Sequence, residues 1–300
     1  MNSQNEGYFP HYAKLCKARE RPRYSDERFR RFFDEAEEVY WWWREENMKI
    51  TGTSKNDIRA KVELLNKYKD KLEFDIAAKY GVHPIDEDKE GKFTGQSGIF
   101  SSILEEFLYY LFKDVIPQGA VMRRKAYAGL VIMPKNIQEL VEGSMKAIVE
   151  TRDLDFIIGA EYVVVIKPKT TLDRLTSSSQ RLEATIPIVA FECKTNIDKS
   201  MIDRCIADAE ILKRGNPNLL YVVLAEYLDF NLEAVPLRAT KVDQIYILRR
   251  MKRLPSGKRT LEALKDREPI HYDLVLDLFE LVKNHLEYGT EEALKRGKLI

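Results

Sequence analysis

Residues 219–225 (LLYVVLA) place an apolar or aromatic side chain at every position, and this run constrains the fold more than any other stretch. In a strand, successive side chains point to opposite faces, so an unbroken apolar run belongs inside a sheet that is covered on both faces. From residue 98 onward, patterns typical of helices alternate with patterns typical of strands. The sequence therefore predicts an α/β fold, with a mixed central sheet flanked by helices.

The other elements follow from their own patterns. The stretch 98–113 is apolar around most of a helix, which predicts a helix sandwiched between other elements. Residues 186–194 (IPIVAFECK) are expected to form a strand, and 152–158 and 161–166 a hairpin that turns at Gly159-Ala160. Further elements are expected as helices at 136–149, 200–213 and 273–287, strands at 120–133 and 243–250, and a polar insertion at 168–185.

The N-terminal part has a different organisation. Residues 25–49 and 56–80 are expected to form two long helices, and Ser25 is the expected N-cap of the first. A polar, glycine-rich stretch without apolar periodicity (GVHPIDEDKEGKFTGQSG) follows them. We therefore predict a helical N-terminal arm over residues 1–95 and a second domain over residues 96–300.

The charge balance excludes a uniformly basic surface. Forty-nine Lys and Arg against 48 Asp and Glu leave a net charge of +1, so a face for a polyanion must come from local surpluses, as in residues 14–31 and 241–259. Three cysteines without a CxxC pair indicate neither a disulfide framework nor a zinc site. With no signal-peptide pattern and no apolar run of about 18 residues, we expect a cytoplasmic protein and no membrane partner.

An acid and a lysine end the otherwise apolar strand 186–194. Alternation places Glu192 and Lys194 on one face of that strand and Cys193 on the other. Charges at the end of a buried strand must be desolvated or find partners. A structural ion pair would explain Glu192 and Lys194 taken alone, and Cys193 is expected to be a small buried apolar side chain.

A second strand carries a similar anomaly. In RDLDFII, Asp153 and Asp155 share a face while Leu154 and Phe156 point the other way, although Asp is rare in strands. If this strand pairs with the one that Glu192 ends, a carboxylate stands next to Glu192. Two neighbouring carboxylates repel each other unless a cation neutralises them, and oxygen ligands suit Mg²⁺. Two carboxylates and a lysine around a metal are the groups needed to hydrolyse a phosphodiester.

Asp155 followed by Glu192-Cys193-Lys194 resembles the motif of the PD-(D/E)xK nuclease superfamily, with leucine in place of the motif's proline. The expected order of elements over about residues 98–230 is similar to that superfamily's core. The stretches GIFSSILEEFLYYLF, TRDLDFIIG and IVAFECKTNIDKSMID further resemble type II restriction endonucleases of the Bpu/BbvCI kind. Those enzymes pair two related subunits on a short asymmetric DNA site, and each subunit cuts one strand.

The resemblance implies a restriction-endonuclease-like domain that hydrolyses double-stranded DNA at a specific short sequence with Mg²⁺-activated water. It implies that Asp155 and Glu192 are Mg²⁺ ligands and that Lys194 positions the water. The backbone carbonyl of Cys193 commonly adds a metal ligand in such sites. The implied partner is a second nuclease subunit, related or identical, and the N-terminal arm would serve DNA recognition or subunit contact.

Two assignments within this site stay open. The family often has a further glutamate on the helix before the core, and both Glu105 and Glu106 qualify; we favour Glu105 because two apolar residues follow the pair. Asp153 competes with Asp155, which we favour because three apolar residues follow it directly.

Other interpretations also stay open. The chain could be a repair or junction nuclease of the same superfamily, or a DNA-binding subunit without catalysis. The run Tyr40–Trp43 wraps around much of a helix, and a place in a core or subunit contact is favoured over base stacking. The insertion 168–185 either enters a DNA groove with Arg174, Gln180 and Arg181 or forms a surface loop.

Overall fold

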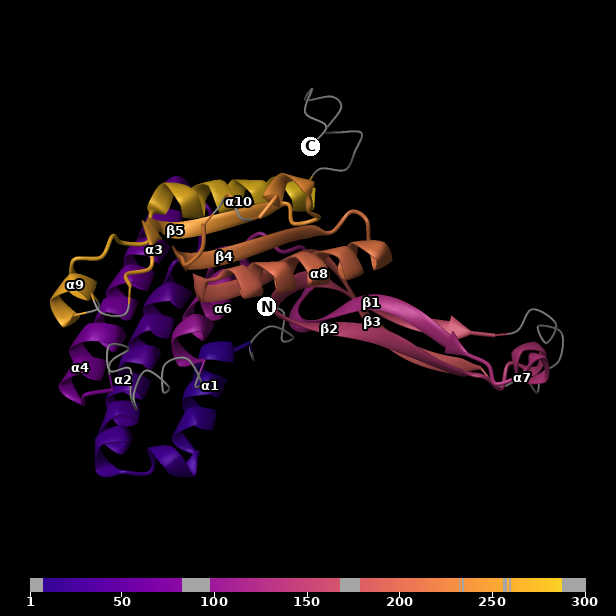
Figure 1. Ribbon diagram of the computed structural model, residues 1–300, viewed down its shortest axis with the longest axis horizontal. Coiled ribbons are helices and arrows are strands. Elements are labelled where there is room, and N and C mark those ends of the chain that lie inside the picture. Colours follow the sequence, from indigo (N-terminus) through magenta and orange to yellow (C-terminus); the bar gives the residue numbers. More distant parts are fainter. Residues whose placement is uncertain are drawn as a thin grey trace, which may run out of the picture.

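The predicted central sheet is present and has five strands (Figure 1). The computed structural model describes residues 8–82, 98–167, 179–231, 233, 235–255, 258 and 260–287. The strands are β1 (Val121–Met133), β2 (Lys146–Ile166), β3 (Gln180–Ile197), β4 (Leu220–Leu228) and β5 (Gln244–Lys252), in this spatial order. The pairs β1–β2 and β2–β3 are antiparallel, whereas β3–β4 and β4–β5 are parallel. This mixed sheet confirms the predicted α/β class.

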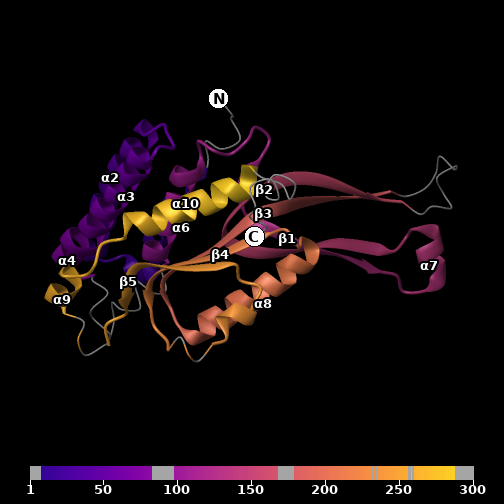
Figure 2. The ribbon, with the colours of Figure 1, turned by 90° about the horizontal axis from the view of Figure 1, so that it is seen from above.

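Helices cover both faces of the sheet. The main ones are α1 (Pro10–Arg19), α2 (Glu27–Lys49), α3 (Lys55–Asp70), α6 (Ile99–Phe112), α8 (Lys199–Gly215) and α10 (Tyr272–Glu287). The short ones are η1 (Pro22–Tyr24), the π-helical η2 (Lys71–Ile76), α4 (Ala77–Lys79), α7 (Ile137–Glu142), η5 (Leu237–Ala239) and α9 (Leu261–Lys265). α6 and α10 pack on one face and α8 on the other, and α1, α2 and α3 lie beyond α6 (Figure 2).

Two elements are buried as their sequences predict. Every residue of α6 except Ser101 is buried, because the sheet lies on one side of this helix and the N-terminal helices lie on the other. Every residue of β4 is buried as well. In β4, Val222 and Leu224 face the apolar cluster that includes α6, while Tyr221 and Val223 face the cluster that includes α8.

The N-terminal helices share one apolar cluster with α6 and the sheet. The two long helices predicted there are present, and α1 precedes them in a region for which no element was predicted. Asp26 rather than Ser25 caps α2, since its carboxylate accepts a hydrogen bond from the Phe29 N–H at 2.9 Å. Residues 83–97 lie outside the described residues, so a boundary near residue 95 stays a prediction.

The predicted hairpin is wrong, because β2 runs unbroken through Gly159 and Ala160. Gly159 lies where the β2–β3 ladder shifts its register. A Cβ atom at Gly159 would fall 2.3 Å from the carbonyl oxygen of Ile186 on β3. The glycine therefore allows a close approach of two backbones, a role that glycines in strands often have, and does not mark a turn.

Two further boundaries also differ from the predictions. The helix predicted at 136–149 ends at Glu142, because Gly143 adopts a positive φ of 74° that closes the last turn. β3 begins at Gln180, inside the predicted insertion, and Arg181 is also part of this strand. Residues 168–178, which include Arg174, lie outside the described residues.

β1, β2 and β3 extend well beyond the helical body, and α7 lies at the far end of this projection (Figures 1 and 2). Most of the exposed large apolar side chains belong to these elements, namely Leu130, Ile132, Met133, Ile137, Leu140, Val141, Ile148, Tyr162, Val163 and Val165. Among the described residues, no helix combines the length and the apolar character needed to cross a bilayer.

Candidate active site

Asp155 lies where the ladder between β2 and β3 ends. The last paired residues at this end are Phe156 and Phe191. Two residues further along β3, the Cys193 N–H donates a hydrogen bond to Oδ2 of Asp155 at 2.8 Å. A side-chain carboxylate thus replaces a backbone carbonyl at the point where the two strands separate.

A bulge in β2 accounts for the direction of this carboxylate. At the site, three residues of β2 stand opposite one residue of β1, Arg124. Bulges redirect side chains and are frequent beside active sites. Leu154 consequently packs with the α8 side of the sheet and Phe156 with the α6 side, so the prediction that these two residues share a face is wrong. Asp153 is exposed, whereas Asp155 meets the acid and the lysine of β3.

Lys194 joins the two predicted acids. Its Nζ donates to Oδ2 of Asp155 at 3.0 Å and to Oε2 of Glu192 at 2.7 Å. The side chain of Cys193 packs in the apolar cluster on the opposite face of β3, as alternation predicts. Burial raises the pKa of the Cys193 thiol, which keeps it protonated and unreactive. The structure therefore brings Asp155, Glu192 and Lys194 together.

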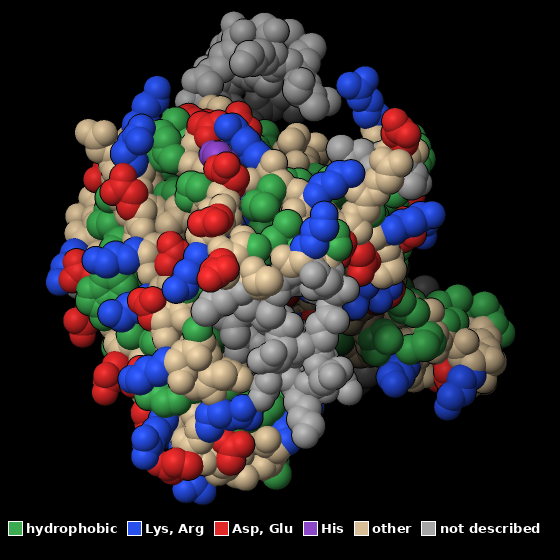
Figure 3. All heavy atoms as spheres, turned by 60° about the vertical axis from the view of Figure 1, so that its left-hand side comes forward, with side chains coloured by type: hydrophobic (Ala, Val, Ile, Leu, Met, Phe, Trp, Pro, Cys, Tyr) green, Lys and Arg blue, Asp and Glu red, His purple; other side chains and the backbone are tan. Residues whose placement is uncertain are grey.

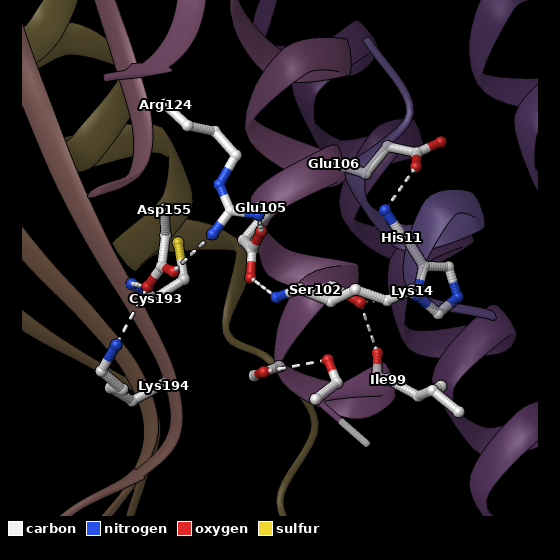
Figure 4. A network of polar contacts seen from close by, with 12 residues as sticks. His11, Lys14, Ile99, Ser102, Glu105, Glu106, Arg124, Asp155, Cys193 and Lys194 are labelled. Atoms are coloured by element: carbon white, nitrogen blue, oxygen red, sulfur yellow. Dashed lines mark hydrogen bonds and ion pairs between the residues drawn. The ribbon is translucent and has the colours of Figure 1, made fainter. Parts of the chain in front are cut away.

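The two glutamates of α6 point in different directions (Figure 4). Glu105 points toward the sheet, and it forms an ion pair with Lys14 of α1 and a longer one, at 3.9 Å, with Arg124 of β1. Glu106 faces the N-terminal helices and accepts three hydrogen bonds, from the Tyr40 hydroxyl, the Tyr110 hydroxyl and the His11 N–H. Only Glu105 therefore lies on the side of α6 that faces Asp155.

Three further residues contact the site, and the sequence analysis did not indicate any of them. Lys14 of α1 contacts Glu105. Arg124 of β1 lies between Glu105 and Asp155, 3.9 Å from each. The Tyr8 hydroxyl donates to the backbone carbonyl of Asp155 at 3.0 Å. The surplus of basic residues around Lys14 was a signal, but it indicated a surface and not this contact.

Burial and mutual repulsion perturb the carboxylates. Burial, and then the charge of Asp155, raise the pKa of Glu192 to about 8. The same two causes raise the pKa of Glu105. Burial acts on Asp155 too, but the Lys194 ammonium and the Cys193 N–H outweigh it and hold the pKa of Asp155 below its usual value. Such closely spaced acids favour the binding of a cation.

The donor set fits a hard divalent cation. Oε2 of Glu105 is buried and has no hydrogen-bond partner among the described residues. Oδ1 of Asp155 lies 3.9 Å from Nη2 of Arg124, which is longer than a hydrogen bond. Mg²⁺ is usually held by one or two carboxylates and several waters. Within the described ranges no group of three His, Cys, Asp or Glu side chains is placed to hold a metal ion, so the fit rests on two carboxylates, which is enough for Mg²⁺.

The aromatic run of α2 is divided between core and surface. Tyr40 and Trp43 are fully buried, and Trp43 stacks on Tyr68 with ring centroids 4.5 Å apart. Trp42 packs beside the Lys67 ammonium, and Trp41 is 39% exposed. The predicted place in a core is confirmed for Tyr40 and Trp43.

Each basic surplus has at least one arginine that pairs with an acid. In residues 14–31, Arg19 pairs with Asp34 of α2, and in the second surplus Arg249 is buried against Glu226. Figure 3 shows a side of the molecule on which Lys and Arg side chains intermingle with Asp and Glu. A DNA-binding role for either surplus stays a prediction.

Comparison with known proteins identifies a family and similar solved structures. The family model described as Bpu10I restriction endonuclease matches residues 96–279. A solved chain described as "native BbvCI A2B2 tetramer at low resolution" superposes with a TM-score of 0.62 at 21% identity, covering 93% of this chain and 96% of that chain. No curated protein sequence matches. The structural match shows a shared fold, and the family model covers more than half of the chain.

Proposed function

The chain belongs to the Bpu10I restriction endonuclease family as a type II restriction endonuclease subunit, and on that premise we propose that it hydrolyses DNA with Asp155, Glu192 and Lys194. The observation that carries this proposal is the position of Lys194, whose Nζ bridges the two carboxylates at 3.0 and 2.7 Å. An acid, acid and lysine set at a gap between two strands has the groups that phosphodiester hydrolysis needs.

Each side chain has a distinct role in the proposed mechanism. Asp155 and Glu192 would hold Mg²⁺, with the Cys193 carbonyl as a further ligand, and Glu105 would add negative charge on the α6 side of the site. When bound, the metal polarises the phosphoryl oxygen and acidifies a water. Lys194 positions that water through its Nζ.

The protonation of Lys194 supports this division of roles. Burial alone would lower the pKa of Lys194, but Asp155 and Glu192 outweigh it and raise the pKa. The ammonium therefore keeps its three protons at neutral pH. In this role it would donate hydrogen bonds to the attacking water and to developing negative charge.

We also propose that the chain works with a second nuclease subunit, identical or related, on double-stranded DNA. The described residues supply one acid, acid and lysine set, which suffices for one strand. The relative described as an A2B2 tetramer supports such pairing. In this proposal residues 1–95 serve DNA recognition or subunit contact, and residues 96–300 form the catalytic domain.

The test is cleavage of supercoiled plasmid in Mg²⁺, with Ca²⁺ as the non-catalytic control. The purified chain is tested first alone and then together with the proposed second nuclease subunit. If the partner is a related chain, we expect nicks at fixed positions from the chain alone and fixed linear fragments from the pair. If the partner is a second copy, the chain alone should give the linear fragments. Glu192→Ala and Lys194→Ala should abolish nicking and keep DNA binding in Ca²⁺. Asp153→Ala is the matched control and should cut normally. Cleavage retained by Glu192→Ala, or a preference for branched DNA over a fixed sequence, would refute the proposal.

A further inference from the structure

Arg124 lies across the carboxylates from Lys194 (Figure 4). Its Nη1 is 3.9 Å from Oε2 of Glu105, and its Nη2 is 3.9 Å from Oδ1 of Asp155. Lys194 contacts the other oxygen of Asp155, Oδ2. The two cations therefore flank the acids from opposite sides, one from β1 and one from β3.

The backbone fixes the position of Arg124. This residue is the single β1 residue opposite the three-residue bulge that contains Asp155. Its Nε donates a hydrogen bond to the carbonyl of Leu154 at 3.3 Å. One nitrogen of the guanidinium is thus tied to the bulge, and this tie directs the two terminal nitrogens toward the acids.

The terminal nitrogens of Arg124 differ from the other cations of the site in their contacts. Lys194 donates two hydrogen bonds to carboxylates, and Lys14 donates one to Glu105. The 3.9 Å contacts of Arg124 are longer than hydrogen bonds, and within the described residues neither terminal nitrogen donates one. Since 45% of the Arg124 side chain is exposed, a ligand can reach these donors from solvent.

A guanidinium with two free terminal nitrogens matches the geometry of a phosphate group. Its planar fork can donate two parallel hydrogen bonds to two phosphate oxygens, and it stays charged at any pH relevant to the protein. A phosphate brought to Asp155 and Glu105 would lie within reach of this fork, because Arg124 stands between those two residues.

We propose that Arg124 is a further catalytic residue, which binds the non-bridging oxygens of the phosphate whose ester is cleaved. This inference rests on the proposed nuclease function and adds the group that holds the substrate. In the transition state the phosphoryl oxygens carry more negative charge than in the ground state. A fixed guanidinium beside them therefore stabilises the transition state more strongly than the bound substrate.

The alternative is that Arg124 only balances the charge of Glu105 and Asp155. Three variants separate the two roles. Arg124→Ala removes the fork, Arg124→Lys keeps the charge without the fork, and Arg123→Ala is the matched control. Arg123 is the preceding residue of β1, is 37% exposed in its side chain, and donates to Glu161 at 3.0 Å.

Two measurements use these variants as full-length proteins. The first is the rate of plasmid nicking in Mg²⁺ with enzyme in excess, with and without millimolar guanidinium chloride, against sodium chloride at equal ionic strength. The second is the affinity for a short DNA duplex in Ca²⁺ at several salt concentrations. The second requires no cleavage, so it tests Arg124 even where the proposed function fails.

We expect Arg124→Ala to lower the nicking rate about 10²–10³-fold, as the loss of one transition-state donor does. Free guanidinium should restore part of that rate, and Arg124→Lys should fall between Arg124→Ala and the wild type. For Arg124→Ala, the magnitude of the slope of log affinity against log salt concentration should be smaller than that of the wild type by about 0.9, because one phosphate contact is lost. Arg123→Ala should match the wild type in both measurements.

Nicking by Arg124→Ala at the rate of Arg123→Ala would overturn the proposal, whatever the salt slope. A slower rate that guanidinium does not rescue, with an unchanged salt slope, would overturn it too, because that pattern belongs to a structural ion pair. A wild type that never nicks, alone or with a second subunit, would refute the nuclease function; an unchanged salt slope would then refute the phosphate contact separately.

Discussion

Trp43 is the centre of the aromatic packing among the N-terminal helices, and we predict that Trp43→Ala destabilises the protein by about 3–5 kcal/mol. Its fully buried ring stacks on Tyr68 and meets Tyr110 edge-on at 5.1 Å. Truncation removes roughly 150 Å² of buried apolar surface, or about 4 kcal/mol. Two aromatic pairs add about 1–3 kcal/mol. The Nε1–H of Trp43 is buried without a hydrogen-bond partner among the described residues. Its removal therefore offsets about 1–3 kcal/mol of this destabilisation.

The assay is urea denaturation followed by far-UV circular dichroism. With an m value of about 3 kcal/mol/M, the midpoint of Trp43→Ala should fall by about 1–1.7 M. Trp41→Ala is the matched control, and its midpoint should stay within about 0.3 M because Trp41 is partly exposed. DNA binding and cleavage per folded molecule should be unchanged in Trp43→Ala. Equal midpoints for the two variants, with weaker DNA binding by Trp43→Ala, would refute a core role for Trp43.

Other variants test the site and the sheet. In the metal-free protein, stability should fall as pH rises from about 4.5 to about 8, because Glu192 binds its proton more tightly when folded; Glu192→Gln should flatten this slope in urea titrations across pH. Glu105→Gln should slow nicking without lowering Tm, whereas Glu106→Gln, which alters an acceptor of three hydrogen bonds, should lower Tm; the reverse pattern would contradict the assignment of the two glutamates. Gly159→Ala should cost about 1–3 kcal/mol in calorimetry, since its Cβ would fall 2.3 Å from a β3 carbonyl. Gly129→Ala, with its nearest atom 3.9 Å away on a side chain, should cost less.

The juxtaposition of Asp155, Glu192 and Lys194 could be predicted because its main cause is local. Two residues apart on a strand, Glu192 and Lys194 must share a face, and charges at the end of an apolar run are rare enough to be noticed. The choice of Asp155 over Asp153 rested on the apolar residues that follow it. The bulge that turns Asp155 inward has no signature in the sequence, and it broke the alternation expected on either side.

The contacts of Lys14 and Arg124 could not be predicted, because they depend on how distant segments meet. Lys14 reaches Glu105 through the packing of α1 on α6, and Arg124 reaches it through the register of β1 against β2. The periodicity of a single segment specifies neither the packing of α1 on α6 nor the register of β1 against β2. Gly159 shows the same limit, since a Gly-Ala pair between two apolar runs has the pattern of a turn until the neighbouring strand is known.

The opposite directions of Glu105 and Glu106 limit how this enzyme can be recombined with its relatives. α6 contacts two parts of the molecule: one side carries Glu105 toward the candidate active site, and the other is hydrogen-bonded to α2 through Glu106 and Tyr40. In a chimera that carries the N-terminal helices of a relative on this core, those helices would pack poorly against α6. The poor packing would displace Glu105. Such a chimera should therefore exchange α6 together with the N-terminal helices. The sheet residues that face Glu105 then have to be matched to the new α6.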